Sequence, residues 1–265
     1  MWAYQHNQHK HFTVHQLAVL SDNYIYLIED HNSDALVVVD PADASTVRNA
    51  CKTMKKPLTH IINTHHHWDH TDGNRSLKET FHCKIIGAAI DAERIPAIDI
   101  QIDENTALKI GDLDIGVLFV PGHTRGHIAY LIDDALFCGD TLFGGGCGRL
   151  FEGTPEQMWH SLSKLAELPE KTSIYCAHEY TLANLEFAQQ VDTDNPDLDH
   201  RIITDRETRT KKHPTIPSSI KLEKQTNPFL RPLDKDFCLR YATEHDLQNN
   251  ALAVFTHLRA SKDRF

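Results

Sequence analysis

The chain has 265 residues, with 27 Lys and Arg against 37 Asp and Glu, so its formal net charge is −10 at pH 7. An acidic chain without a block of basic residues repels phosphate backbones, which excludes nucleic acid as an expected partner. No apolar run is long enough to span a membrane, and the polar stretch at residues 1–11 has no apolar core typical of a targeting segment. Six scattered cysteines without a C-x-x-C pair favour a reduced chain (Cys51, Cys83, Cys138, Cys147, Cys176 and Cys238). We therefore expect a cytoplasmic protein with no membrane partner, and as a separate expectation a monomer.

The first two thirds of the chain alternate short apolar strands with helices. Strands are predicted at residues 12–20, 24–29, 35–40, 59–63, 84–87, 113–120, 127–132, 135–138 and 173–177. A helix at 44–56 ends before Pro57, and a second helix begins with Thr154 as its N-cap and Pro155 as its first residue and runs to about residue 168. This alternation predicts an α/β domain over residues 1–178.

The remainder of the chain has a different pattern. Strand-like runs disappear after His178, and helices are predicted at 181–191, 197–209 and 236–247, followed by a short tail. Residues 179–265 are therefore predicted to form a smaller helical C-terminal domain.

A cluster of ligand-type residues directly follows the predicted strand 59–63. The segment 64–70 reads Thr-His-His-His-Trp-Asp-His, which has the pattern T-H-x-H-x-D-H. His65 and His67 are two residues apart, so in an extended chain they point the same way, whereas His66 points away. Asp69 and His70 add an oxygen and a nitrogen, a mixed donor set that zinc accepts. The segment therefore predicts a metal site in which His66 has no part.

Single ligand-type residues follow three other predicted strands. His123 comes after strand 113–120, Asp140 after 135–138 and His178 after 173–177. Any one of them could be an ordinary turn residue, but the three together favour metal ligation. His6, His9 and His11 are expected to be solvated, and His60 to be an ordinary strand residue.

The T-H-x-H-x-D-H pattern with its downstream His, Asp and His resembles the metallo-β-lactamase superfamily, whose fold is a four-layer αβ/βα sandwich. The resemblance implies two divalent metal ions, with zinc favoured and iron or manganese also compatible with the donors. It assigns His65, His67 and His123 to the first ion, Asp69, His70 and His178 to the second, and Asp140 to both. Asp69 and Asp140 are accordingly the predicted catalytic carboxylates.

Four further segments resemble the hydroxyacylglutathione hydrolase (glyoxalase II) family. They are residues 146–153, 177–181, 227–231 and 259–263, so with the metal motif the resemblance spans nearly the whole chain. It implies that five residues bind the substrate: Arg149, Phe151, Tyr180, Arg259 and Lys262. Phe151 departs from the family pattern, because many members have a tyrosine there, and one hydroxyl contact is expected to be absent.

The resemblance implies hydrolysis of S-D-lactoylglutathione to D-lactate and glutathione, the second step of methylglyoxal detoxification. A hydroxide shared by two divalent ions is a strong nucleophile near neutral pH and would attack the thioester carbonyl. The leaving thiol has an ordinary pKa of about 8.5, so it can depart without a strong general acid. A thioester therefore suits this donor set better than an amide.

Other functions remain possible at this point. The nearest is a persulfide dioxygenase of the same fold, which would use one redox-active iron and leave the second donor set redundant. A β-lactamase has no role for the helical C-terminal part. A metal-binding scaffold, or a nucleic-acid processing factor with an inert site, is disfavoured by the complete donor set and the negative charge.

Overall fold

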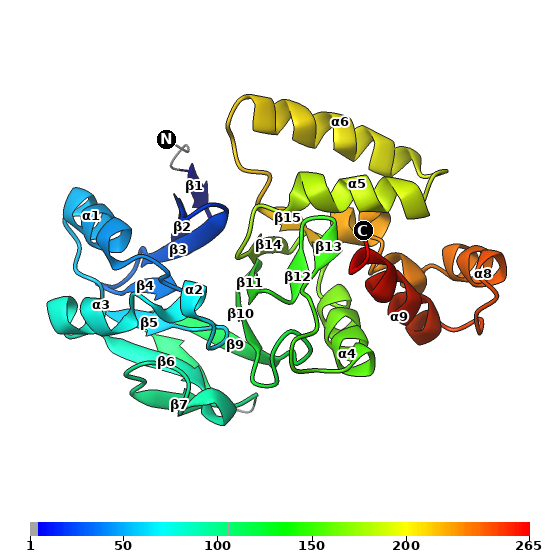
Figure 1. The fold of residues 1–265 in the computed structure, drawn as a ribbon. Coiled ribbons are helices and arrows are strands. Elements are labelled where there is room, and N and C mark those ends of the chain that lie inside the picture. Colours follow the sequence, from blue (N-terminus) through cyan, green and yellow to red (C-terminus); the bar gives the residue numbers. More distant parts are fainter. Residues whose placement is uncertain (1–4, 105) are drawn as a thin grey trace. The chain divides into compact units, whose positions relative to one another are not determined.

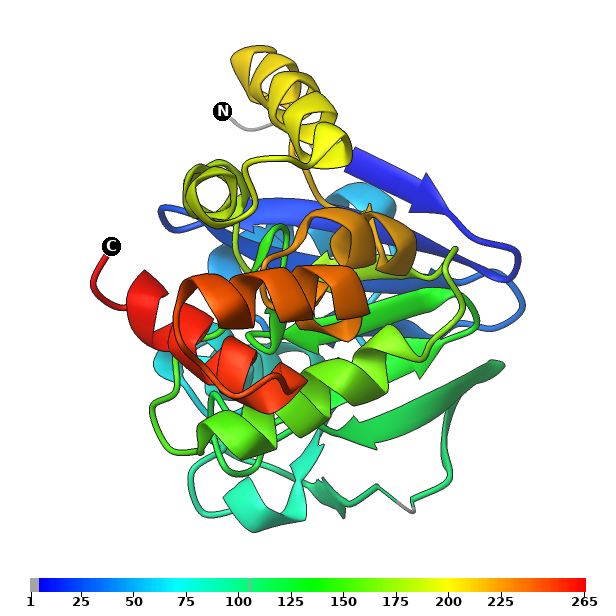
Figure 2. The same cartoon turned by 90° about the vertical axis from the view of Figure 1, so that its right-hand side faces the viewer.

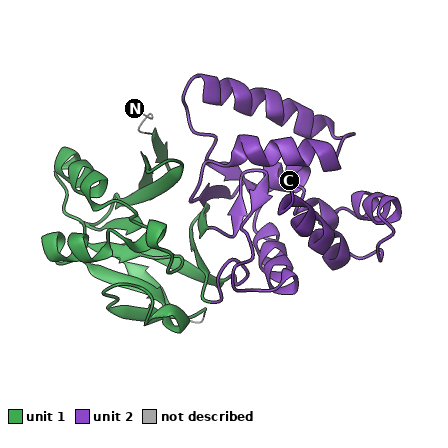
Figure 3. Ribbon diagram, in the orientation of Figure 1, with its two compact units in different colours: residues 1–119, 126–139 green, residues 120–125, 140–265 purple. Residues whose placement is uncertain are grey.

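The computed structural model describes residues 5–104 and 106–265, and the chain divides into two compact units (Figures 1 and 3). Unit 1 comprises the described residues up to Phe119 together with Gly126–Gly139. Unit 2 comprises Val120–Arg125 and Asp140–Phe265, so the boundary expected after residue 178 falls inside it. Part of the N-terminal stretch interpreted from the sequence, residues 1–4, lies outside the described residues.

Unit 1 is built on a seven-stranded sheet whose strands are neighbours in chain order. They are β1 (Gln5–Gln8), β2 (Phe12–Val19), β3 (Asn23–Asp30), β4 (Leu36–Val39), β5 (His60–Ile62), β6 (Lys84–Ala88) and β7 (Ile100–Ile102). Pairing is antiparallel from β1 to β4 and parallel from β4 to β7. The parallel part places the end of β5, which precedes four candidate ligands, beside the end of β4 at one edge of the sheet.

Helices cover this sheet and enclose its core. They are α1 (Ala44–Met54), the short α2 (Trp68–Thr71), α3 (Asn74–Phe81) and a 3₁₀ turn at Ala89–Asp91. Asp43 caps α1 by accepting from the backbone N–H of Thr46 at 2.8 Å, and the helix ends at Lys55 in the left-handed conformation. Val47 of α1 and Leu77 of α3 are fully buried in the apolar cluster that includes the sheet strands.

A second set of strands completes unit 1, and its members pair antiparallel with one another in chain order: β8 (Leu108–Ile110), β9 (Leu113–Phe119), β10 (Ile128–Ile132) and β11 (Ala135–Gly139). The Tyr130 hydroxyl of β10 donates to the Asn63 carbonyl at 2.9 Å, and the Phe137 ring of β11 lies 5.6 Å from that of Tyr26 in β3. The two sets of strands therefore pack face to face.

Unit 2 is mainly helical, and in Figure 2 the view of Figure 1 is turned so that its right-hand side, where these helices lie, faces the reader. Its elements are β12 (Leu142–Phe143), β13 (Gly146–Cys147), α4 (Pro155–Ala166), β14 (Ser173–Cys176), α5 (Thr181–Val191), α6 (Pro196–Thr210), β15 (Ser218–Ser219), α7 (Ile220–Thr226), a 3₁₀ turn at Arg231–Leu233, α8 (Lys235–Glu244) and α9 (Ala251–Lys262). β12 and β13 form an antiparallel hairpin. Helix α5 packs against α6, and α9 packs against α4 and α8.

The expected elements are present with bounds that shift by a few residues, with one clear exception. The short tail expected after residue 247 is wrong, because Ala251–Lys262 form α9 with Asn250 as its N-cap. The Asn250 side chain accepts from the backbone N–H of Ala253 at 2.9 Å. Among the described residues, no helix is both long and apolar enough to cross a membrane.

Candidate active site

Four of the predicted metal ligands lie in unit 1, directly after β5. His65 and His67 are in the loop, and Asp69 and His70 are in α2. The Thr64 hydroxyl donates to Asp40 Oδ2 at 2.6 Å and accepts from His65 Nδ1 at 3.1 Å. His65 Nε2 therefore carries the ring's lone pair, and it lies 3.0 Å from His67 Nδ1. Two ring nitrogens that converge in this way are arranged to share one cation.

Asp40, at the end of β4, orients this half of the ligand set and was not identified from the sequence. Its carboxylate accepts from the Thr64 backbone N–H at 2.7 Å, the Thr64 hydroxyl and His70 Nδ1 at 3.0 Å. Because His70 Nδ1 is the donor, its Nε2 carries the lone pair and faces Asp69 Oδ2 at 3.5 Å. Asp40, His65 and His70 form a cluster with cation-binding spacing, but the Asp40 oxygens already accept three hydrogen bonds. We therefore regard Asp40 as a carboxylate that fixes the ligand orientation.

Two amides and one further ring complete the surroundings of these ligands. Asn23 Nδ2 lies 3.1 Å from Asp69 Oδ2, and Asn63 Nδ2 donates to the His70 carbonyl at 3.0 Å. The buried His127 ring is stacked on His65 with centroids 4.7 Å apart. The ligand loop is thus held by contacts from several strands, which favours a single geometry.

His66 has a separate partner. Its Nδ1 lies 2.9 Å from Oδ2 of the buried Asp91, which also forms an ion pair with Arg94. Burial alone would raise the pKa of Asp91, but the hydrogen bonds from His66 and Arg94 outweigh it and lower that pKa below its ordinary value. His66 therefore has a structural role in holding its loop.

The other three predicted ligands lie in unit 2 and converge there. Asp140 Oδ2 lies 3.3 Å from His123 Nε2, and Asp140 Oδ1 lies 3.3 Å from His178 Nε2. All three residues are buried. His123 Nδ1 donates to the Arg149 carbonyl at 2.8 Å, so the nitrogen that faces Asp140 carries the lone pair. A carboxylate between two imidazoles is the arrangement expected of a bridging ligand.

The separations within each unit fit divalent cations. Donor atoms bound to one tetrahedral ion at about 2.0–2.1 Å each lie roughly 3.3 Å apart. The ring nitrogens of His65 and His67 are 3.0 Å apart, and Asp140 is 3.3 Å from each of its two histidines. Lone-pair nitrogens and carboxylates at these distances repel one another unless a proton or a cation lies between them. The spacing of this donor set therefore fits divalent metal ions.

The five predicted substrate-binding residues all lie in unit 2. The Arg149 side chain is 61% exposed and the residue Phe151 is also 61% exposed, so both can reach a ligand. The Phe151 ring lies 5.2 Å from that of His123, and the Tyr180 ring is stacked on His178 with centroids 4.8 Å apart. Phe151 and Tyr180 are therefore adjacent to predicted metal ligands.

Arg259 and Lys262 lie on α9 and are more strongly held than a flexible tail would allow. The buried Arg259 donates to the Cys147 carbonyl at 3.1 Å and to Asp263 Oδ1 at 3.0 Å, and its guanidinium lies 4.9 Å from the Phe229 ring centre. Lys262 Nζ donates to the Ala183 carbonyl at 3.0 Å, and burial, together with the charge of Arg259, lowers its pKa. Any substrate contact by Arg259 would therefore come in addition to a structural role.

Comparison with known proteins gives a consistent result. Residues 20–178 match the model of the metallo-beta-lactamase superfamily, and residues 179–265 match that of the hydroxyacylglutathione hydrolase C-terminus. The chain is 49% identical to a hydroxyacylglutathione hydrolase of Synechococcus sp., with 94% of this chain and 98% of the relative covered. It is 45% identical to that of Rhodospirillum rubrum, with 95% and 98% covered. Among solved structures, it is similar to ETHE1 from Myxococcus xanthus, with a TM-score of 0.66, 26% identity and coverage of 93% and 98%.

Proposed function

The chain belongs to the hydroxyacylglutathione hydrolase family of the metallo-beta-lactamase superfamily, and from this premise we propose that it hydrolyses S-(2-hydroxyacyl)glutathione thioesters. The proposed reaction converts S-D-lactoylglutathione to D-lactate and glutathione, as the second step of methylglyoxal detoxification. The observation that carries the proposal is the placement of Asp140 between His123 and His178, with exposed Arg149 and Phe151 in the same unit. We further propose that the protein acts as a monomer in the cytoplasm, with residues 1–178 as the metallo-β-lactamase domain and 179–265 as the substrate-binding helical domain.

We propose two divalent ions per chain, with zinc favoured over iron or manganese. His65, His67 and His123 would hold one ion and Asp69, His70 and His178 the other, with Asp140 as a ligand of both. When bound, such ions lower the pKa of water toward neutrality and polarise a carbonyl group. The neutral histidines and two carboxylates of this set suit zinc, which accepts mixed nitrogen and oxygen donors.

The residues of the chain contribute orientation and charge. Asp40 holds His70, and the Arg149 carbonyl holds His123, each by accepting from Nδ1, so both rings keep Nε2 as the ligating atom. Asp140 would supply a negative charge that offsets the repulsion between two bound cations. The leaving glutathione thiolate has an ordinary pKa of about 8.5, so no side chain is needed to protonate it before it departs.

The substrate moiety is anionic, and an acidic protein must bind it through local positive charge. Arg149, Arg259 and Lys262 supply three cationic groups in unit 2, and Tyr180 adds a hydroxyl. Charge-assisted hydrogen bonds from such groups to carboxylates are about twice as strong as neutral ones. We propose that these residues bind the glutathione part, while Phe151 contributes apolar contact only.

The experiment that tests this function is direct. Metal-replete protein should hydrolyse S-D-lactoylglutathione with release of one thiol per substrate, followed with a thiol reagent. The persulfide dioxygenase alternative predicts instead oxygen consumption with glutathione persulfide. Oxygen uptake with the persulfide but no thiol release from the thioester would reject the proposal, as would hydrolysis that a metal chelator does not affect.

A further inference from the structure

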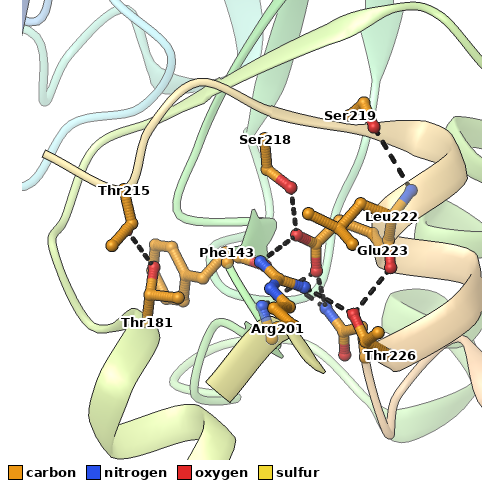
Figure 4. A network of polar contacts seen from close by, with 12 residues as sticks. Phe143, Thr181, Arg201, Thr215, Ser218, Ser219, Leu222, Glu223 and Thr226 are labelled. Atoms are coloured by element: carbon orange, nitrogen blue, oxygen red, sulfur yellow. Dashed lines mark hydrogen bonds and ion pairs between the residues drawn. The ribbon is translucent and has the colours of Figure 1, made fainter. Parts of the chain in front are cut away.

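Figure 4 shows a buried ion pair in unit 2 that is not among the predicted metal ligands or substrate-binding residues. Arg201 of α6 and Glu223 of α7 are 3% and 0% exposed, and Arg201 Nη2 donates to Glu223 Oε1 at 2.7 Å. Arg201 Nη1 donates to Thr226 Oγ1 at 2.6 Å, and the Ser218 hydroxyl donates to the same Glu223 oxygen. Burying two charges costs desolvation energy, and apolar residues of similar volume often stabilise a fold equally well. Stability alone is therefore a weak explanation for the pair.

The second carboxylate oxygen of Glu223 contacts a segment of the chain that follows the predicted metal ligand Asp140. Glu223 Oε2 accepts from the backbone N–H of Gly145 at 2.8 Å and from Asn227 Nδ2 at 2.9 Å. Gly145 lies in the turn of the β12–β13 hairpin, with φ of +63°. The ion pair thus fixes a backbone turn that is distant from it in sequence.

Side chains from α5, α9 and the segment after α7 hold the same hairpin through its carbonyl groups. Asn227 Nδ2 lies 2.9 Å from the Gly146 carbonyl and 3.2 Å from that of Phe143. Asn184 donates to the Gly144 carbonyl at 3.0 Å. A Cβ atom at Gly146 would lie 2.3 Å from Asn184 Nδ2, so the packing leaves no room for a side chain there. The hairpin is therefore held by buried hydrogen bonds at successive peptide groups.

Both ends of the hairpin are tied to predicted metal ligands. It begins two residues after Asp140, and Gly148, which follows it, donates to the Thr141 carbonyl at 3.2 Å. A Cβ atom at Gly148 would lie 2.0 Å from the Asp140 carbonyl oxygen. The next residue, Arg149, accepts from His123 Nδ1 through its own carbonyl. A shift of the hairpin would therefore displace Asp140, His123 and Arg149 together.

We propose that Glu223, held by Arg201, and Asn227 are positioning residues, which act through the hairpin Leu142–Cys147 to fix Asp140, His123 and Arg149. The catalytic consequence rests on the proposed function. The structural consequence, a fixed hairpin, does not rest on the proposed function, because it concerns only the geometry of the hairpin. Asn227 is the sharper target for a test, since its removal leaves no buried charge without its counter-ion.

The test compares Asn227→Ala with Asp205→Asn as a matched control. Asp205 contacts the same Arg201, through Nε at 3.2 Å, and among the described residues it makes no hydrogen bond or ion pair with the hairpin. Three quantities are measured on the full chain: hydrogen–deuterium exchange of the backbone amides at residues 141–149 in metal-free protein, Co²⁺ affinity, and kcat and KM for the thioester. In Asn227→Ala we expect faster exchange at 141–149, and Co²⁺ affinity and kcat/KM reduced by about 10- to 100-fold, the range for residues that orient metal ligands. Asp205→Asn should retain wild-type values of all three, even if its unfolding midpoint falls.

Wild-type exchange and Co²⁺ affinity in Asn227→Ala would overturn the proposal, and so would equal losses in both variants. If Asn227→Ala does not fold, Glu223→Gln, which keeps the side-chain volume, is measured in its place against the same expectations. Failure of both variants to fold would assign these residues to folding alone and also overturn the proposal. A wild-type protein without thioesterase activity would reject the proposed function only, because exchange and Co²⁺ binding need no substrate.

Discussion

At the scale of the residue, ligand-type side chains differ in the hydrogen-bond partners that the rest of the chain provides for them. His123 and His70 each donate from Nδ1 to a fixed oxygen, which leaves Nε2 as the atom that can bind a cation. His66 donates instead to Asp91, within a cluster that contains Arg94. His66 and His70, four residues apart, therefore have different hydrogen-bond partners, which their spacing only partly indicates.

The first prediction uses this contrast. Asp140→Asn should lower kcat/KM by more than about 100-fold, because loss of residues that merely orient ligands already costs 10- to 100-fold. His66→Ala should affect activity little but lower the free energy of unfolding, because Asp91 loses a hydrogen-bond donor. Steady-state kinetics and urea unfolding of both variants check this. Similar kinetic losses in the two would contradict the ligand assignment.

Phe151 gives a second prediction at this scale. Its exposed ring lies next to His123, where a tyrosine hydroxyl could reach a bound thioester. One regained hydrogen bond contributes about 0.5–1.5 kcal/mol, so Phe151→Tyr should lower KM by a few-fold to about tenfold with little change in kcat. An unchanged or higher KM in a folded variant would show that residue 151 does not contact the substrate.

The sequence predicts candidate cation ligands more readily than the residues that orient them. The spacing of His65, His67, Asp69 and His70 predicts ligands because local geometry places them together. Asp40 and His127 contact this segment only after distant strands pair, and no local pattern reports such contacts. The acidic residue at the end of β4 was the one available signal for Asp40, since neighbouring strand ends often converge.

At the scale of the element, α9 was missed although its signals are present in the sequence. Asn250 is a good N-cap, and the buried Val254, Phe255 and Leu258 recur at helical spacing. The helix places Arg259 inward, where it holds the Cys147 carbonyl, and Lys262 nearer the surface. The two basic residues should therefore differ in the effect of their removal.

Lys262→Ala is accordingly the cleaner test of glutathione binding. One charge-assisted hydrogen bond is worth about 1.5–3 kcal/mol, and because Lys262 is only half-buried we expect the lower end, a KM about tenfold higher. The kcat should change little, since contacts remote from the thioester are similar in the ground and transition states. For a small thioester without glutathione carboxylates, the wild type and Lys262→Ala should have the same KM and kcat. Equal KM increases for the two substrates would exclude a role for Lys262 in recognising the glutathione part of the substrate.

Helix α4 provides a prediction about stability. Thr154 accepts from the backbone N–H of Gln157 at 3.2 Å, and Gln157 Oε1 accepts from the Thr154 N–H at 3.0 Å, which is a capping box. Thr154→Ala should therefore lower the free energy of unfolding by about 1 kcal/mol. Thr243→Ala, within the exposed face of α8, is the matched control and should cost nothing, because alanine favours a helix interior. Urea denaturation measures the free energy of unfolding of both variants. Equal values for Thr154→Ala and Thr243→Ala would contradict the capping role.

At the scale of the whole molecule, the division into units could not be predicted from local pattern. The sequence pattern changes from strands to helices after His178. Unit 2 nevertheless includes the earlier segment Val120–Arg125. The reason is long-range packing: Gly122, with φ of +149°, is pressed against Met158 of α4, and its carbonyl accepts from Gly153 at 3.1 Å. His123 of the same loop donates to the Arg149 carbonyl, and Pro121 accepts from the Ser161 hydroxyl at 2.7 Å. Such contacts between residues distant in sequence leave no periodic signal.

This division leads to the last prediction, because four predicted ligands belong to unit 1 and three to unit 2. If the seven side chains act together as proposed, protein prepared without chelator should contain close to two equivalents of divalent metal per chain. Metal that binds only the folded chain adds stability by mass action, about 2.7 kcal/mol at a free concentration 100 times Kd. Removing the metal should therefore lower the unfolding midpoint and abolish activity, and zinc should restore both. Asp140→Asn should gain less stability from zinc than the wild type, whereas His66→Ala should gain the same amount. A reproducible single equivalent with full activity, or a midpoint that does not respond to metal, would contradict a shared two-ion site.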